Sequence, residues 1–84
     1  VKLFPEDKLA NLNAAYIAIE RGDKVSAEKY LKKVGDTPEA NNARGCLAVL
    51  KEDYQAAKEY FEKAVKGGLK KAQENLDKVN KVLE

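Results

Sequence analysis

The sequence has no histidine, no methionine and no tryptophan, and Cys46 is its one cysteine. Without histidine, the chain excludes His-based general acid–base chemistry and a Ser-His-Asp triad, and it excludes zinc sites built from His or Cys clusters. A single cysteine also excludes an intramolecular disulfide. We therefore expect a protein that is not an enzyme and that uses neither a metal nor a cofactor.

Long apolar runs are also missing. No segment approaches the roughly 18–20 apolar residues that a membrane-spanning helix needs, so we expect no direct membrane insertion. The 84 residues carry 16 Lys and Arg against 14 Asp and Glu. A chain of this length leaves little room for both a core and a deep active site, which favours a binding module. Because it starts at Val1 and lacks methionine, we expect a piece of a longer protein, whose compartment stays open.

Apolar residues recur at helical spacing almost from end to end. Leu9, Leu12, Tyr16 and Ile19 form one stripe of a helix expected to begin near Pro5 and end at Gly22. Cap and stop residues predict further helices over residues 23–35, 37–51 and 54–66 and from residue 69 onwards. The pattern predicts five antiparallel helices of about 11–17 residues, joined by turns of about two to four residues.

The chain repeats itself with a shift of thirty residues. Under this shift Asp23 falls on Asp53, Tyr30 on Tyr60 and Leu31 on Phe61. Small residues also fall on small residues, which indicates a duplicated helix–turn–helix unit.

The second unit resembles the tetratricopeptide repeat family. The residues that carry the resemblance are Gly45, Asp53-Tyr54-Gln55-Ala56-Ala57 and Tyr60-Phe61-Glu62-Lys63-Ala64. In that family small residues stand where two helices cross closely, here Gly45, Ala57 and Ala64, and a bulky one stands at Phe61. The resemblance implies an all-α, right-handed stack of helix–turn–helix repeats. We expect repeat 1 at residues 5–35, repeat 2 at 36–66 and a capping helix at 69–84.

This sequence departs from the family pattern in three ways. Its period is thirty residues rather than thirty-four, Asn11 and Asn41 replace bulky residues, and Arg44 replaces leucine. A charge buried at Arg44 needs carboxylates or carbonyls. We expect it to reach solvent or to pair with Glu20 or Asp53, and the alternative is that it meets a carboxylate of a ligand.

Segments such as Arg21-Gly22-Asp23 and Asn41-Asn42-Ala43-Arg44-Gly45 are also similar to helical repeat segments in envelope-associated proteins of Bacteroides-type bacteria. This similarity implies a periplasmic or envelope location.

The repeat resemblance implies that the first helix of each unit lines a concave binding face. The positions that match are Leu9, Leu12, Tyr16, Ile19 and Glu20 in repeat 1, and Glu39, Asn42, Cys46, Val49 and Leu50 in repeat 2. For Leu12, Ile19 and Val49, packing between helices is the favoured interpretation. Tyr16 and Leu50 are equally compatible with contact to a ligand, and Cys46 is expected to pack as a small hydrophobic residue.

Family members that bind a peptide's C-terminal carboxylate use basic residues and Asn on this face. Asn13 matches one such position, but its equivalent in repeat 2 is Ala43, and the positions of the basic residues hold Leu12, Asn42, Glu20 and Leu50. We therefore expect no carboxylate clamp on this face.

The last 22 residues carry six lysines and three acids. Pairs such as Glu74–Lys78 at i,i+4 are typical of a solvated helix, so we expect no nucleic-acid binding. Ala72, Leu76, Val79 and Leu83 form an inner stripe, as expected of a helix that caps a repeat stack.

These features predict a non-catalytic protein–protein interaction or scaffold module that binds a peptide, another protein or another segment of its parent chain. The alternatives are a structural spacer, or a segment that self-associates weakly through its apolar face. An enzyme would depend on carboxylates alone, such as Glu20, Glu39 and Asp53, and is the least favoured reading.

Overall fold

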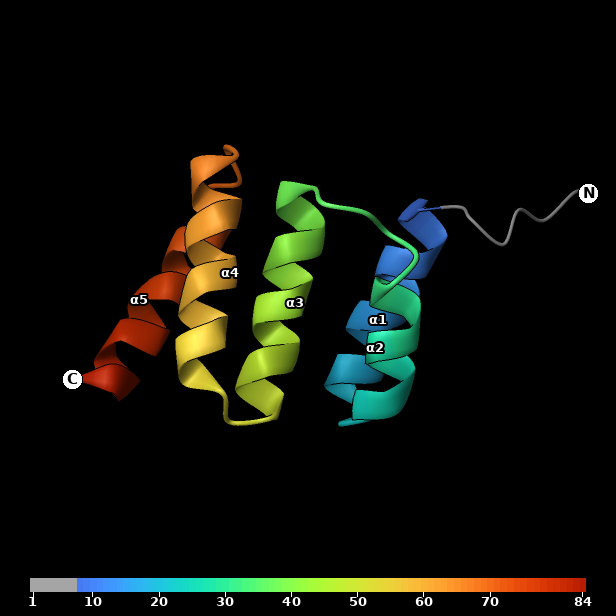
Figure 1. Cartoon of the computed structure of the whole chain (residues 1–84), viewed down its shortest axis with the longest axis horizontal. Helices are drawn as coiled ribbons and strands as arrows, with labels where there is room; N and C mark the ends of the chain where they lie inside the picture. The colour runs from blue at the N-terminus through green and yellow to red at the C-terminus, as the bar shows by residue number, and fades with distance from the viewer. Residues whose placement is uncertain (1–7) are drawn as a thin grey trace, which may run out of the picture.

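The computed structural model describes residues 8–84, and within them the chain forms helices and turns without a strand. The helices are α1 (Lys8–Glu20), α2 (Lys24–Leu31), α3 (Pro38–Leu50), α4 (Tyr54–Lys66) and α5 (Lys71–Leu83). Successive helices run antiparallel, and α3 lies between the α1–α2 pair and α4 (Figure 1). The prediction of an all-α helical repeat is confirmed. The predicted helix start at Pro5 lies outside the described residues.

Helices α2, α3 and α4 each begin at a side chain that caps the first turn. The Asp23 carboxylate accepts a hydrogen bond from the Ser26 N–H at 3.1 Å, and the Asp53 carboxylate accepts one from the Ala56 N–H at 3.2 Å. Thr37 Oγ1 accepts from the Ala40 N–H at 3.1 Å, with Pro38 directly after it. Such caps satisfy N–H groups that have no partner within the helix. Asp23 and Asp53 are the aspartates that coincide under the thirty-residue shift.

Three helices end with the same backbone turn. At the end of α1, the Gly22 N–H bonds to Ile19 O at 3.0 Å and the Asp23 N–H bonds to Ala18 O at 2.8 Å. This is a Schellman motif, which needs a positive φ at the residue after the cap. Gly22 has φ 75° and Gly68, after α4, has φ 100°, but the equivalent residue after α3 is Glu52 with φ 63°.

Helix α2 is shorter than predicted. It has eight residues and ends at Leu31, so Val34 lies beyond the helix, although it is buried. The physical reason is that the Lys33 and Val34 N–H groups bond three residues back, to Tyr30 O and Leu31 O, before Gly35 turns the chain with φ 71°. Helix α5 likewise starts at Lys71 rather than at Leu69, because the Ala72 and Gln73 N–H groups bond three residues back, to Leu69 O and Lys70 O, in a tighter turn.

Arg44 closes the connection between α2 and α3. Its Nη2 donates to Leu31 O at 3.1 Å, at the C-terminal end of α2, and its Nη1 donates to Asn41 Oδ1 at 3.3 Å. Asn41 Nδ2 in turn donates to Asp36 Oδ1 at 2.9 Å. The expected pairing with Glu20 or Asp53 is not found: among residues 8–84 no carboxylate lies within 4.0 Å of the Arg44 guanidinium. The guanidinium instead contacts a backbone carbonyl, that of Leu31, which was the other kind of partner expected.

The buried side chains form two cores. The N-terminal core joins α1, α2 and α3, and its members are Ala15, Ala18, Ala27, Leu31, Val34, Ala40, Ala43 and Leu47. The C-terminal core joins α3, α4 and α5, and its members are Ala48, Ala57, Phe61, Leu76 and Val79. Phe61 is 1 % exposed and lies against Gly45 of α3, so α4 packs closely on α3 at this point.

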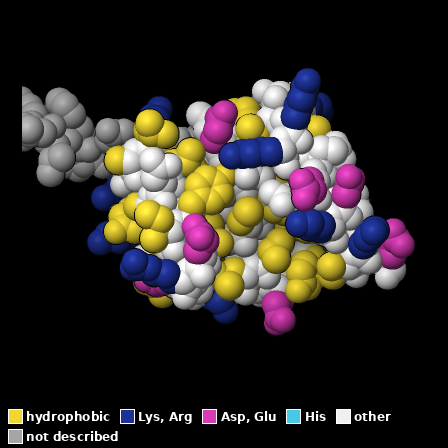
Figure 2. All heavy atoms as spheres, turned by 180° about the vertical axis from the view of Figure 1, so that it is seen from behind, with side chains coloured by type: hydrophobic (Ala, Val, Ile, Leu, Met, Phe, Trp, Pro, Cys, Tyr) yellow, Lys and Arg dark blue, Asp and Glu magenta, His cyan; other side chains and the backbone are white. Residues whose placement is uncertain are grey.

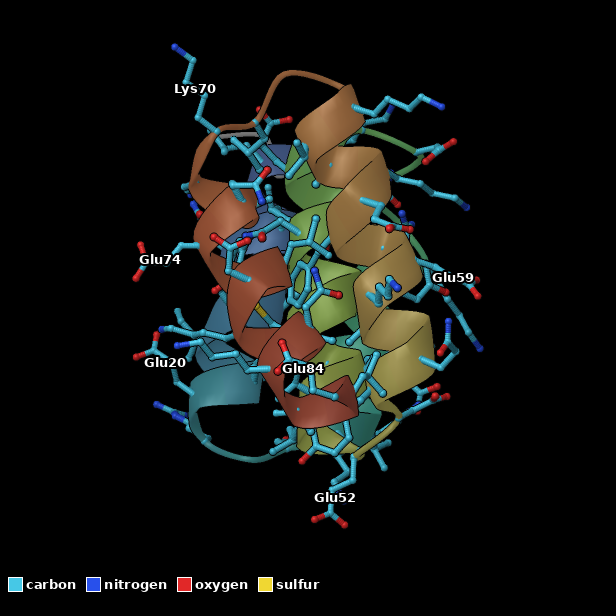
Figure 3. All side chains as sticks on the ribbon, turned by 90° about the vertical axis from the view of Figure 1, so that its left-hand side faces the viewer. Glu20, Glu52, Glu59, Lys70, Glu74 and Glu84 are labelled. Carbon is cyan, nitrogen blue, oxygen red and sulfur yellow. The ribbon has the colours of Figure 1, made fainter. Side chains whose placement is uncertain are left out.

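Helix α5 covers the C-terminal core with one face. Ala72, Leu76 and Val79 are buried, but Leu83 is 42 % exposed, so the predicted inner stripe stops one turn before the end of the helix. Figure 3 looks onto α5 and shows Lys70 and Glu74 pointing away from the other helices. The role of α5 as a cap, and the repeat bounds 5–35, 36–66 and 69–84, stay predictions.

Candidate protein-binding face

One broad face of the molecule is built by α1, α3 and α5; we call it the first-helix face. Figure 2 shows it from behind the view of Figure 1: hydrophobic side chains gather across its middle, and charged side chains surround them. Figure 3 shows Glu20 and Glu74 projecting from the molecule on one side and Glu59 of α4 on the opposite side. The face therefore has an apolar centre between charged margins of both signs.

A chain of hydrogen bonds crosses this face and joins its three helices. Asn42 Nδ2 on α3 donates to the Tyr16 hydroxyl on α1 at 2.8 Å, and the Tyr16 hydroxyl lies 3.3 Å from Glu39 O, to which it donates. On the other side, Asn75 Nδ2 of α5 donates to Asn42 Oδ1 at 3.0 Å. Asn42 is 3 % exposed, so both of its amide atoms find partners where water is scarce.

Tyr16 is only partly available to a ligand. Its ring is half-buried and packs against the N-terminal core, and Lys71 Nζ of α5 lies 5.9 Å from the ring centroid. Burial raises the pKa of the Tyr16 hydroxyl above its ordinary value, although the hydrogen bond from Asn42 acts in the opposite direction. The hydroxyl therefore stays protonated at neutral pH and serves the contacts between helices.

Beside this chain lies a mostly apolar hollow of about 190 Å³ between α3, α4 and α5. Cys46, Val49 and Val82 line it together with Tyr54, Phe61, Asn75, Lys78 and Val79. Val49 is 36 % exposed and Val82 is 55 % exposed. Two valines are thus left open to solvent at the edge of a cavity that a side chain could enter.

The other residues that the sequence predicted for this face are either half-buried or exposed. Leu12, Ile19 and Leu50 are half-buried and pack against the N-terminal core. Leu9 is 67 % exposed and Glu20 is exposed. The structure brings Tyr16 and Asn42 together and places Cys46 with Val49, while Leu50 contributes more to the core than to the open surface.

The Cys46 thiol is half-buried against the C-terminal core. Burial raises the pKa of this thiol, and the charge of Lys71 partly opposes the shift. A thiol that stays protonated is a poor nucleophile and a poor metal ligand. Within residues 8–84, no three His, Cys, Asp or Glu side chains are grouped so that they could bind a metal ion.

Sequence reasoning missed the contribution of α5 to this face. Asn75, Lys71 and Val82 all belong to the segment that was expected only to cap the stack. A signal for Asn75 was present, because it stands three residues after Ala72 and four before Val79 and so lies at the edge of the inner stripe. A polar residue at that place in an otherwise apolar stripe is typical of a buried hydrogen bond.

Part of the chain matches a known protein family. Residues 38–66, which contain α3 and α4, match the family model described as Tetratricopeptide repeat. None of the curated proteins and none of the solved structures matches the chain, so the similarity to envelope-associated proteins of Bacteroides-type bacteria stays a prediction. Among the described residues, no helix has both the length and the apolar character needed to cross a bilayer. The match and the five-helix stack together support a tetratricopeptide-like repeat at residues 38–66.

Proposed function

We propose that this chain is a non-catalytic interaction module that binds a peptide or protein segment on its first-helix face. A tetratricopeptide repeat suggests a protein–protein interaction module, and such repeats are generally not catalytic. The observation that carries the choice of face is the hollow between α3, α4 and α5, with Val49 and Val82 exposed at its edge.

The chemistry of the hollow suggests how a partner is held. Its lining is dominated by Val49, Val79, Val82 and the Phe61 ring, and its polar groups include Asn75, Lys78 and the Tyr54 hydroxyl. A partner segment would insert an aliphatic side chain here and cover the two exposed valines. Removing this apolar surface from water supplies the affinity, at about 25 cal/mol per Å² before the costs of association.

The margins of the face set the polar requirements of the partner. Lys71 and Lys78 lie on α5, while Glu20 ends α1 and Glu39 lies in the first turn of α3, and all four are exposed. A partner with acidic residues beside α5 and basic residues beside α1 would match this arrangement. Exposed charge pairs contribute little affinity, so these margins would affect orientation and association rate more than binding strength.

The experiment compares Val49→Asp and Val82→Asp with a matched control, Val25→Asp. Val25 is 78 % exposed on α2, which does not contribute to the first-helix face. Each immobilised variant, shown by circular dichroism to stay folded, is used to capture proteins from a lysate of the source cells. We expect a protein retained by the wild type and by the control to be lost from Val49→Asp and Val82→Asp. If all variants retain the same proteins, this face is not the binding surface.

Tyr16 and Leu50 are less suitable for this test. Tyr16 accepts the hydrogen bond of buried Asn42, and Leu50 packs against the N-terminal core, so a substitution at either would disturb the fold together with the face.

The same variants separate a partner from self-association. A second copy on the same apolar face would raise the mass measured by light scattering above 9.3 kDa as concentration increases, and Val82→Asp would abolish the rise. A wild type that stays at 9.3 kDa and captures nothing would favour the role of a structural spacer.

A further inference from the structure

On the face opposite to the first-helix face, α2 and α4 border a second and larger hollow with α3 as its floor. Its volume is about 340 Å³, within the range of small-molecule sites. Figure 1 looks onto this side and shows α3 between α2 and α4. The residues that line it are Glu28, Leu31, Lys32, Arg44, Leu47, Ala48, Lys51, Asp53, Ala56 and Tyr60.

Arg44 places a positive charge in this hollow that no side chain of residues 8–84 neutralises. Its guanidinium donates to two uncharged oxygens, Leu31 O at 3.1 Å and Asn41 Oδ1 at 3.3 Å. A guanidinium has five N–H donors, so donors remain for a further acceptor. Because Arg44 is half-buried, its charge is less well hydrated than that of a surface arginine.

The two carboxylates of the hollow are already engaged. Glu28 Oε1 lies 3.0 Å from Lys51 Nζ, an ion pair that links α2 to the end of α3. The Asp53 carboxylate accepts the Ala56 N–H as the cap of α4. Lys32, at the end of α2, is a further positive charge among the lining residues. The lining therefore carries three cations and two anions, which leaves a net positive charge. Lys51 is paired with Glu28, whereas Arg44 has no ion-pair partner in the lining.

The rest of the lining is apolar. Leu31, Leu47, Ala48 and Ala56 contribute hydrocarbon, and Tyr60 contributes a half-buried ring. This combination suits a ligand with one negative group and a small hydrophobic body. A carboxylate fits the planar donor pattern of a guanidinium, which binds it through two parallel hydrogen bonds.

We propose that this hollow binds a compact organic acid, with its carboxylate on Arg44 and its apolar body against Leu47 and the Tyr60 ring. The site is distinct from the first-helix face, so it goes beyond the proposed function, and either can fail without the other. Arg44 lies on α3 where its side chain reaches the C-terminal end of α2.

The test is an NMR titration of the whole ¹⁵N-labelled chain at pH 7 with 3-phenylpropionate and, as the uncharged control of the same shape, 3-phenylpropionamide. We expect saturable shifts of the Leu47, Ala48 and Ala56 amide signals, with a dissociation constant on the order of 1 mM for a ligand of this size. Because the amide cannot form a charge-assisted hydrogen bond with Arg44, its dissociation constant should be at least about tenfold larger than that of the acid.

Two variants complete the design. Arg44→Gln removes the charge and the guanidinium donors, and should raise the dissociation constant of 3-phenylpropionate at least about tenfold. Lys81→Gln removes an exposed charge of α5, which does not line this hollow, and should leave the affinity within about twofold. Equal affinity for acid and amide, shifts confined to α1 or α5, or the absence of saturable shifts would each overturn the proposal. If Arg44→Gln does not fold, the comparison of acid and amide in the wild type decides.

Discussion

Gly45 of α3 lies so close to Phe61 of α4 that a methyl group at Gly45 would sit 2.4 Å from ring atom Cε1. Two further atoms of the same ring would lie 2.6 and 2.8 Å away. Phe61 is 1 % exposed and belongs to the C-terminal core, so its ring has little room to move. The crossing of these two helices therefore depends on the absence of a side chain at residue 45.

Gly45→Ala should destabilise the domain. Overpacking a core costs about 1–3 kcal/mol, and a clash with three atoms of a buried ring favours the upper end. The better helix propensity of alanine returns about 1 kcal/mol, so we expect a net loss of about 1–2 kcal/mol in urea unfolding. Glu39→Ala, at an exposed position of the same helix, should change stability by less than about 0.5 kcal/mol. Equal stability of Gly45→Ala and wild type would contradict the close crossing.

Glu52→Gly should stabilise the domain. Glu52 has φ 63° in the turn after α3, where its repeat equivalent is Gly22 with φ 75°. A left-handed conformation costs a non-glycine residue about 1–2 kcal/mol, whereas the extra freedom of glycine in the unfolded chain costs about 0.5–1 kcal/mol. We therefore expect a gain of up to about 1.5 kcal/mol by thermal unfolding.

The reciprocal change tests the same reasoning. A Cβ added at Gly22 would have no neighbouring atom within 4 Å. A loss of stability in Gly22→Ala would therefore come from the positive φ of the backbone alone. Changes of the same sign at residues 22 and 52 would refute the equivalence of the two turns.

Leu76→Asp should unfold the domain rather than weaken binding alone. Leu76 is 9 % exposed and packs in the C-terminal core. A carboxylate buried there without a partner costs several kcal/mol, which is a large part of the stability of a small domain. The matched control is Lys81→Asp, which adds the same carboxylate at an exposed position of α5. An unchanged melting temperature in Leu76→Asp would refute the capping role of α5.

The Cys46 thiol should react slowly in the folded protein. Because burial raises its pKa, less thiolate is present at pH 8 than in the unfolded chain, and a disulfide reagent such as DTNB reacts with the thiolate. We expect a slower reaction in buffer than in 8 M urea. A raised pKa means that the folded state holds the proton more tightly. The corresponding stability is therefore complete below the pKa of the unfolded thiol and is lost as pH rises through the folded pKa.

The control for this measurement carries Cys46→Ser and Lys24→Cys, which moves the thiol to an exposed position of α2. That thiol should react at similar rates with and without urea. If native Cys46 reacts as fast as the exposed thiol, its side chain is more accessible than its half-buried position indicates.

Much of the fold could be predicted because its signals are local. Apolar spacing, Asp23 and Asp53 as caps, and Gly22 as a stop each act within a few residues. The early end of α2 could not be predicted from apolar spacing, because Val34 is apolar and buried although it lies beyond the helix. The positive φ of Glu52 could not be predicted either, because glutamate is not a residue type that favours this backbone conformation.

The candidate site was less predictable than the fold because its contacts join distant residues. Tyr16 and Asn42 are 26 residues apart, and Asn42 and Asn75 are 33 residues apart. Periodicity, cap signals and the repeat resemblance placed Tyr16 and Asn42 on the correct helices, but they carry no information on which polar groups meet across helices.

The hydrogen-bond chain through Tyr16, Asn42 and Asn75 also has a consequence for binding kinetics. Three helices contribute to the first-helix face, and the chain fixes their relative positions before any partner arrives. A preorganised surface loses little conformational entropy on association and needs no slow rearrangement after the first encounter. Association should therefore proceed in a single concentration-dependent phase, and differences in affinity among partners should arise from how long each complex lasts.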